Sequence, residues 1–204
     1  MTNVPVAALQ GPRIDTGRGV RALGLLGVLA SPAFVVAWLA GGFGSPDAPK
    51  GIVALQLLFL VGWASCLVGM QRLGAAGGGK ARRLLLLELF GVSLAMTQEL
   101  QDLLLSAPNR TSVVYRVADA AWPISVLFML VVGVATARSG VLPGWRRVAA
   151  LACGLTLPLS LAIAAIAGRS AMGPAFGILT ACAWGALGYA VATANPMGTS
   201  GEKV

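Results

Sequence analysis

Six apolar segments of helix length constrain the fold of this chain most strongly. They cover residues 22–43, 52–70, 84–105, 113–137, 148–168 and 173–194, and short polar connections separate them. About twenty residues of α-helix cross a hydrocarbon layer that is about 30 Å thick. Only 11% of the residues are charged, whereas soluble domains average about a quarter. The sequence therefore predicts an all-α integral membrane protein, a bundle of six transmembrane helices.

The connections between the segments predict how this bundle lies in the membrane. Eleven basic residues fall on one side of it and four on the other. The first group is Arg13, Arg18, Arg21, Arg72, Lys80, Arg82, Arg83, Arg138, Arg146, Arg147 and Lys203, and the second is Lys50, Arg110, Arg116 and Arg169. Since basic loops stay in the cytoplasm, both termini are expected to be cytoplasmic, an N-in/C-in topology.

The domain organisation follows from the same pattern. We expect one transmembrane domain over residues 21–194, between a flexible cytoplasmic tail over residues 1–20 and a second cytoplasmic tail over residues 195–204. A bacterial plasma membrane is the expected location, because the chain is rich in alanine, glycine and leucine and shows no targeting signal. The net charge of +8 resides in the connections, so we interpret it as a topology signal and expect no nucleic-acid partner.

The chain's residue types exclude several chemistries. It contains no histidine, which removes bis-histidine haem ligation, the usual zinc sites and Ser-His catalysis. Its three cysteines lie singly inside apolar segments, as buried thiols that pack between helices do. They are Cys66, Cys153 and Cys182. We therefore expect no cofactor, no metal site and no catalytic residue.

Charged residues inside the third and fourth segments mark the candidate functional site. They are Glu88, Glu99, Asp102, Arg116 and Asp119. A charge in hydrocarbon costs roughly a few kcal/mol or more unless it is paired or hydrated, so such a cluster is a site candidate by default. Glu88 lies about one turn inside the cytoplasmic edge, so we expect its side chain to extend toward Arg82 or Arg83 and reach water.

Helix geometry orders the other four charges into two pairs. A short connection makes the two helices antiparallel neighbours, so residues equally far from its midpoint, near Asn109, lie at equal depth. Asp102 and Arg116 each stand seven residues from that midpoint, which predicts an ion pair near the outer surface. Glu99 and Asp119 each stand ten residues away, which predicts two facing carboxylates one turn deeper.

Two facing carboxylates in a low-dielectric setting resist ionising together, so one of them is expected to hold a proton or a cation. Gln98 and Tyr115 supply further polar groups. The candidate ligand-binding or proton-binding residues are thus Glu99, Asp119, Asp102, Arg116, Gln98 and Tyr115. In a purely structural alternative, Asp102 and Arg116 anchor the helix ends, or Glu99 and Arg116 form one fixed interhelical pair.

Small residues predict how the last two helices pack. Gly173, Gly177, Ala181 and Gly185 form one seam on the sixth segment, and Ala150, Gly154, Pro158 and Ala162 form one on the fifth. Close packing of small residues drives helix association in lipid. We expect these seams to face each other or a neighbouring subunit, so the expected partners are the lipid bilayer and a second copy or another membrane protein.

Three functions agree with this sequence. The first is small-solute or proton-coupled transport or binding through an outward-facing acidic site between the third and fourth helices. The second is a non-catalytic membrane subunit or scaffold that associates through the small-residue seams. The third is a membrane enzyme on a lipid-soluble substrate, in which paired carboxylates do acid–base work and Ser93 or Thr97 lies on the same helix.

Overall fold

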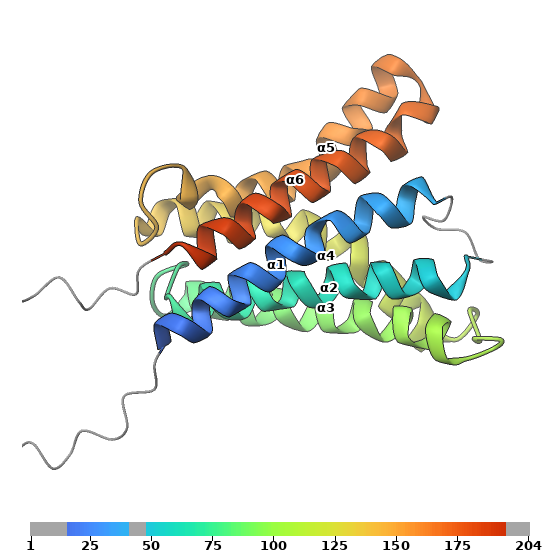
Figure 1. Cartoon of the computed structure of the whole chain (residues 1–204), viewed down its shortest axis with the longest axis horizontal. Coiled ribbons are helices and arrows are strands. Elements are labelled where there is room, and N and C mark those ends of the chain that lie inside the picture. Colours follow the sequence, from blue (N-terminus) through green and yellow to red (C-terminus); the bar gives the residue numbers. More distant parts are fainter. Residues whose placement is uncertain (1–15, 41–47, 195–204) are drawn as a thin grey trace, which may run out of the picture.

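The computed structural model describes residues 16–40 and 48–194, and over these residues it contains helices and no strands (Figure 1). The long helices are α1 (Thr16–Leu39), α2 (Lys50–Arg72), α3 (Lys80–Leu104), α4 (Val113–Ser139), α5 (Ala149–Ala167) and α6 (Met172–Ala192). Two short 3-10 helices, η2 (Gly144–Val148) and η3 (Arg169–Ala171), precede α5 and α6. The predicted all-α architecture is confirmed for this part of the chain.

Within the described ranges, five helices are long and apolar enough to cross a membrane, namely α1, α2, α4, α5 and α6. α3 is as long as its neighbours, but it contains acidic and basic residues along its length. They are Lys80, Arg82, Arg83, Glu88, Glu99 and Asp102. The fold is therefore a multi-pass membrane helical bundle with five membrane-length helices and a sixth, more polar one.

Helix α1 begins earlier than the sequence pattern predicts. The predicted tail over residues 1–20 is too long, because α1 already begins at Thr16. Val20 is buried in the core, so this first turn packs with the rest of the bundle. The remainder of that tail, the tail over residues 195–204, and the basic residues Arg13 and Lys203 lie outside the described residues.

The six helices form a closed ring. Each packs against its neighbours in the sequence, and α1 closes the ring against α6. Because successive helices alternate in direction, the start of α1, the end of α6 and the α2–α3 and α4–α5 connections share one end (Figure 1). We call it the basic end, since its described connections and helix ends contain Arg18, Arg21, Arg72, Lys80, Arg82, Arg83, Arg138, Arg146 and Arg147. The α3–α4 and α5–α6 connections lie at the opposite end.

Aromatic side chains fill the middle of the ring. They come from four helices: Phe34 in α1, Phe59 and Trp63 in α2, Trp122 in α4, and Phe176 and Trp184 in α6. Neighbouring ring centroids lie between 4.8 and 6.5 Å apart, the range of favourable aromatic pairs. This cluster separates the two ends of the bundle with a dense apolar layer.

The small-residue seam of α6 packs against α1 within the same chain. A Cβ added at Gly173 would overlap the indole of Trp38, and one added at Gly185 would meet the hydroxyl of Ser31. At Gly188 the α1 backbone itself lies too close for any side chain. The predicted contact between the α5 and α6 seams is wrong, because the glycine side of α6 lets the α1 backbone approach closely.

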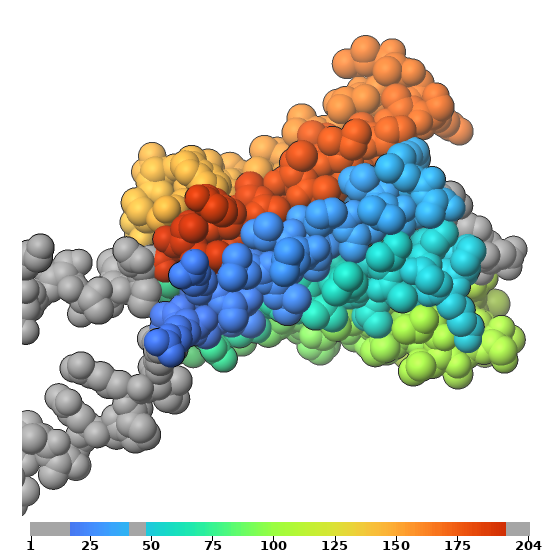
Figure 2. Space-filling view, viewed as in Figure 1, coloured from blue at the N-terminus to red at the C-terminus, as the bar shows by residue number. Residues whose placement is uncertain are grey.

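The seam of α5 also has a different neighbour from the predicted one. A Cβ at Gly154 would overlap the backbone of α4 at Met129 and Leu130, so this glycine allows α5 to approach α4. At the opposite end, α5 and α6 project away from α1 and α2 as a separate hairpin (Figure 2). Ile166, near the end of α5, is 88% exposed there. The ring is therefore tight near the basic end and open at the opposite end.

Candidate functional site

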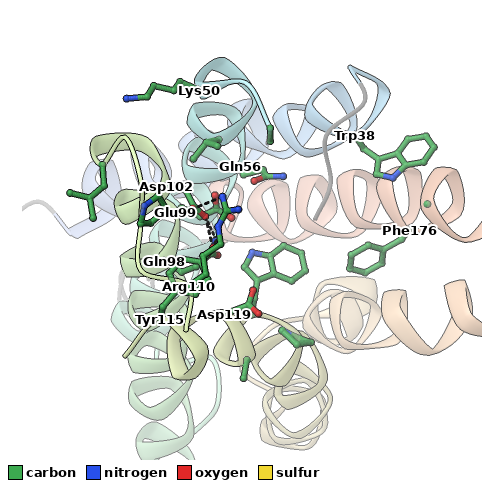
Figure 3. A pocket seen from close by; sticks show the side chains of 18 of the residues that line it. Trp38, Lys50, Gln56, Gln98, Glu99, Asp102, Arg110, Tyr115, Asp119 and Phe176 are labelled. Carbon is green, nitrogen blue, oxygen red and sulfur yellow. Dashed lines mark hydrogen bonds and ion pairs between the residues drawn. The ribbon is translucent and has the colours of Figure 1, made fainter. Parts of the chain in front are cut away.

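A cavity of about 900 Å³ opens among the helices at the end opposite to the basic end (Figure 3). Side chains of all six long helices line it, including Trp38 of α1, Gln56 of α2, Glu99 of α3, Asp119 of α4 and Leu157 of α5. Ligand pockets in proteins typically measure about 300–1,000 Å³, so this cavity has room for a small organic solute. Its position at the meeting point of the ring's helices makes it the candidate functional site.

Asp102 stands at the centre of a hydrogen-bond network at one wall of the cavity. The hydroxyl of Tyr115 donates to its Oδ2 at 2.8 Å, and the amide of Gln98 donates to the same oxygen. Nη2 of Arg110 lies 3.4 Å from Oδ1 as an ion pair. These three donors satisfy both oxygens of the carboxylate. Asp102 therefore ties the end of α3 to α4 and to the connection between them.

The predicted partner of Asp102 was wrong. Among the described residues its ion pair is with Arg110 of the connection, and Arg116 is exposed and outside the cavity lining. The reason is the rotation of α4: Tyr115 and Ala118 are the buried residues of its first two turns. One residue corresponds to about 100° around a helix of 3.6 residues per turn. That rotation turns Arg116 away from α3.

Glu99 lies deeper than Asp102 and is 5% exposed. The amide of Gln56 in α2 is its partner: with the nitrogen facing Glu99, it donates to Oε2 at 3.0 Å and to Oε1 at 3.3 Å. This amide is a neutral donor, and Glu99 forms no ion pair with a basic residue within the described part of the chain. A neutral amide can hydrogen-bond to both forms of a carboxyl group: its NH2 group donates to the carboxylate, and its oxygen accepts from the protonated form.

Asp119 lines the same cavity from α4 and is exposed to it. It forms no hydrogen bond or ion pair with any residue that the structure describes. Glu99 and Asp119 lie near each other, and Figure 3 places both on the same cavity, which Trp122 also lines. The cavity thus brings together two carboxyl groups that form no ion pair with any residue in the described part of the chain.

The rest of the lining is aromatic or basic. Trp38 and Phe176 lie on one side of the cavity (Figure 3), and Trp122, whose ring centroid is 5.9 Å from that of Phe176, extends this apolar wall. Lys50 and Arg169 also line the cavity, but both are exposed. Lys50 begins α2 and Arg169 begins η3, at the end of the bundle opposite to the basic end. Figure 3 shows the Lys50 side chain extending away from Glu99. Lys50 and Arg169 therefore lie at the exposed rim of the cavity, whereas Glu99 is buried inside it.

Glu88 is outside this cavity and differs from its prediction. Its side chain is 1% exposed, and its Oε1 has no hydrogen-bond partner. Arg82 and Arg83 are exposed, and no ion pair joins them to Glu88 within the described ranges. The expected extension of Glu88 toward these arginines is wrong, because α3 turns Glu88 to the same inner face as the buried residues Leu85 and Val92.

Sequence reasoning missed several residues of the cavity. Gln56 had a visible signal, because it is the one amide inside the otherwise apolar stretch from Ile52 to Met70. Arg110 had no comparable signal, since a loop side chain can turn in many directions. The aromatic wall could not be distinguished from ordinary core residues, because its sequence spacing alone does not show which rings border a cavity.

Comparison of the chain with models of known protein families, with curated proteins and with solved structures gives no match. The class of protein therefore follows from the fold alone. The chain is a multi-pass helical membrane protein with a cavity that contains carboxyl groups.

Proposed function

We propose that all six helices cross the membrane and that both termini are cytoplasmic. Two features of α3 support a sixth crossing. Glu88 and Glu99 face the interior, whereas the exposed face of the helix is mostly apolar and can contact lipid. The two hydroxyls on this face, of Ser93 and Thr97, donate to backbone carbonyls of α3. That face contains Leu86, Leu87, Phe90, Leu100 and Leu104. The positive-inside rule then assigns the basic end to the cytoplasm, and the cavity opens to the outer side.

In this orientation the protein binds and transports a small solute, and Glu99 and Asp119 are the charged groups that bind it. The observation that carries this proposal is the cavity of about 900 Å³ into which both carboxyl groups reach. Asp102 is already satisfied by Tyr115, Gln98 and Arg110. Glu99 and Asp119 keep oxygen atoms available for a solute, which is what a binding site requires.

The chemistry of the lining favours a solute with one positive charge and an apolar part. Carboxyl groups attract the charge, while the rings of Trp38, Trp122 and Phe176 supply apolar surface and cation–π contacts. A cation held over an aromatic face gains about 0.5–2 kcal/mol, more where water is excluded. Amines and quaternary ammonium compounds are the simplest members of this class.

The other two functions have less support. The glycine seam of α6 is occupied by α1, so it does not argue for a partner protein, and association with a second copy stays a prediction. For an enzyme, Ser93 and Thr97 are poor nucleophiles. Their hydroxyls donate to backbone carbonyls of α3, and neither residue lines the cavity.

Binding of benzyltrimethylammonium to the purified protein tests the proposal. Trp38 and Trp122 line the cavity, so quenching of tryptophan fluorescence reports occupancy directly. Benzyl alcohol and phenylacetate contain the same ring with no charge and with a negative charge. We expect saturable quenching and a raised melting temperature with the cation alone, since a ligand that binds the folded state stabilises it.

Charge-removing variants assign the site. Glu99→Gln and Asp119→Asn should each weaken cation binding about tenfold, since a lost hydrogen bond to a charged group costs about 1.5–3 kcal/mol and 1.4 kcal/mol is tenfold. Arg116→Gln is the matched control, because Arg116 is exposed outside the cavity. Equal binding of all three probes, or undiminished binding in both carboxyl variants, would contradict the proposal.

A further inference from the structure

Glu88 is a buried carboxyl group that the outer cavity does not use. It is 1% exposed, and its Oε1 forms no hydrogen bond. Eleven residues separate it from Glu99, about three helical turns or about 16 Å along α3. Both residues are therefore on the buried face of the helix, and between them this face presents Val92 and Ala95. α3 thus has one acidic residue at the cavity and a second one farther along the same face, with apolar residues between them.

No charged residue of another helix lies at the depth of Glu88. Helices α1, α2 and α4 contain Asp, Glu, Lys or Arg only toward their ends, and Asp119 is the innermost of these residues. Helices α5 and α6 contain none. The titratable neighbours are thiols: Cys153 of α5 lies near both Glu88 and Cys66 of α2. Both cysteines are buried. Because α3 and α4 are antiparallel neighbours joined by a short connection, Met129 is the residue of α4 at the depth of Glu88, and it is uncharged.

An ionised carboxylate in such surroundings is very costly. Removing an unpaired charge from water costs several kcal/mol or more, so a buried acid without a partner holds a proton instead. A leucine or methionine at this position would fill the space without that cost. Since intramembrane carboxyl groups without structural partners are typical of proton relays, the position of Glu88 indicates a functional role.

We propose that Glu88 is a second proton-binding site, on the cytoplasmic side of the aromatic layer, and that protons pass between it and Glu99 as the solute moves. This inference rests on the proposed function and names its coupling ion. When a cation from the outer side occupies the cavity, Glu99 is ionised and its proton is released to the outer side. When the cation leaves toward the cytoplasm, Glu99 takes up a proton that comes from the cytoplasm through the carboxyl group of Glu88. The exchange is one proton for one positive charge.

The interior between the two acids contains a polar group that can support this transfer. Ser125 of α4 is buried against Gly91 of α3, between the levels of Glu88 and Glu99. A buried hydroxyl is a hydrogen-bonding position for internal water. Ser125 therefore gives the proton one polar position along a path that is otherwise apolar.

Proteoliposomes that contain a trapped pH-sensitive dye test the role of Glu88. Addition of benzyltrimethylammonium outside should drive protons out of wild-type vesicles. Glu88→Gln should lose this proton movement and keep wild-type cation affinity in detergent, because the outer cavity is intact. Glu88→Asp, which keeps a carboxyl group, should retain part of the movement. Ser93→Ala is the matched control on the exposed face of α3 and should behave as wild type.

Stability separates this role from a structural one. Glu88→Met removes an unpaired carboxyl group from the interior, so its melting temperature should equal or exceed that of wild type. A lower melting temperature in both the Met and the Gln variants would show a structural role and overturn the inference. Wild-type proton movement in Glu88→Gln would overturn it as well. Cation binding without any proton movement in the wild type would overturn this inference alone, whereas absent cation binding contradicts the proposed function.

Discussion

Three acidic side chains of α3 occupy different surroundings, although the sequence makes them look alike. Asp102 receives hydrogen bonds from Tyr115 and Gln98 and an ion pair from Arg110. Within residues 16–40 and 48–194, the donor to Glu99 is the neutral amide of Gln56 alone. Glu88 has a free oxygen in an apolar interior. A carboxylate with several donors is fixed in place, while one with few donors can exchange a proton or accept a solute.

The first residue-scale prediction concerns the donor of the Asp102 network. Tyr115→Phe removes the hydroxyl that donates to Asp102 at 2.8 Å and keeps the ring. The free energy of unfolding should fall by about 1.5–3 kcal/mol, the usual worth of a hydrogen bond to a charged group. Thermal unfolding of the purified protein measures this. Tyr189→Phe is the control, because Tyr189 is exposed, and an equal effect in both variants would argue against a structural role for Asp102.

A second residue-scale prediction concerns the partner of Glu99. Gln56→Leu removes the amide that donates to Glu99 and keeps a similar volume. The ionised form of Glu99 then loses a donor, so cation affinity should fall by about threefold to tenfold, in line with about 0.5–1.5 kcal/mol for one hydrogen bond. Fluorescence titration with benzyltrimethylammonium provides the measurement. Unchanged affinity would mean that Gln56 does not support the binding form of Glu99.

At the scale of the helices, glycines decide how closely α1 and α6 approach. At Gly188 a side chain would meet the backbone of α1 near Gly24 and Val28. Gly188→Val should therefore destabilise the protein by about 1–3 kcal/mol, the usual cost of overpacking. Gly51→Ala is the matched control, because nothing lies within 4 Å of the added Cβ. Thermal unfolding distinguishes them, and equal stability of both variants would contradict the close packing of α1 and α6.

The helices themselves could be predicted from the sequence, because runs of apolar residues and polar connections set their limits. The shared face of Glu99 and Asp102 could be predicted as well, since helical periodicity alone fixes it. The rotation of α4 could not: a shift of one residue decides whether Tyr115 or Arg116 meets α3, and both are compatible with the pattern. The position of Arg110 also could not be predicted, because the fold of a connection depends on the helices that it joins.

At the scale of the whole molecule, the ring is closed by aromatic packing in its middle and open at one end. α5 and α6 project away from α1 and α2 at that end (Figures 1 and 2), and Pro158 lies within α5. Proline removes a backbone hydrogen bond and allows a helix to bend. A transporter of this shape would close by moving the α5–α6 hairpin toward the cavity.

Spin labels can measure this closure. Ile166 near the end of α5 and Leu104 at the end of α3 are both strongly exposed, so labels there should not disturb the core. We expect benzyltrimethylammonium to shorten the distance between the two labels in wild type, and about tenfold more cation should be needed for the same change when Glu99→Gln is added. A distance that never responds to the cation would show that the hairpin does not close over the site.

The most direct test of the account is outside labelling of a cysteine at Asp119. In a Cys182→Ser background the two remaining native cysteines are buried, so Asp119→Cys provides the one accessible thiol among the described residues. A membrane-impermeant thiol reagent added to intact cells should modify it. Benzyltrimethylammonium should slow the reaction at a concentration about tenfold above that needed for binding to wild type, because Glu99 still binds the cation in the cavity and blocks access. Arg138→Cys at the basic end should react only after the membrane is opened. If Asp119→Cys stays unmodified in intact cells while Arg138→Cys reacts, the outward-facing acidic cavity is contradicted.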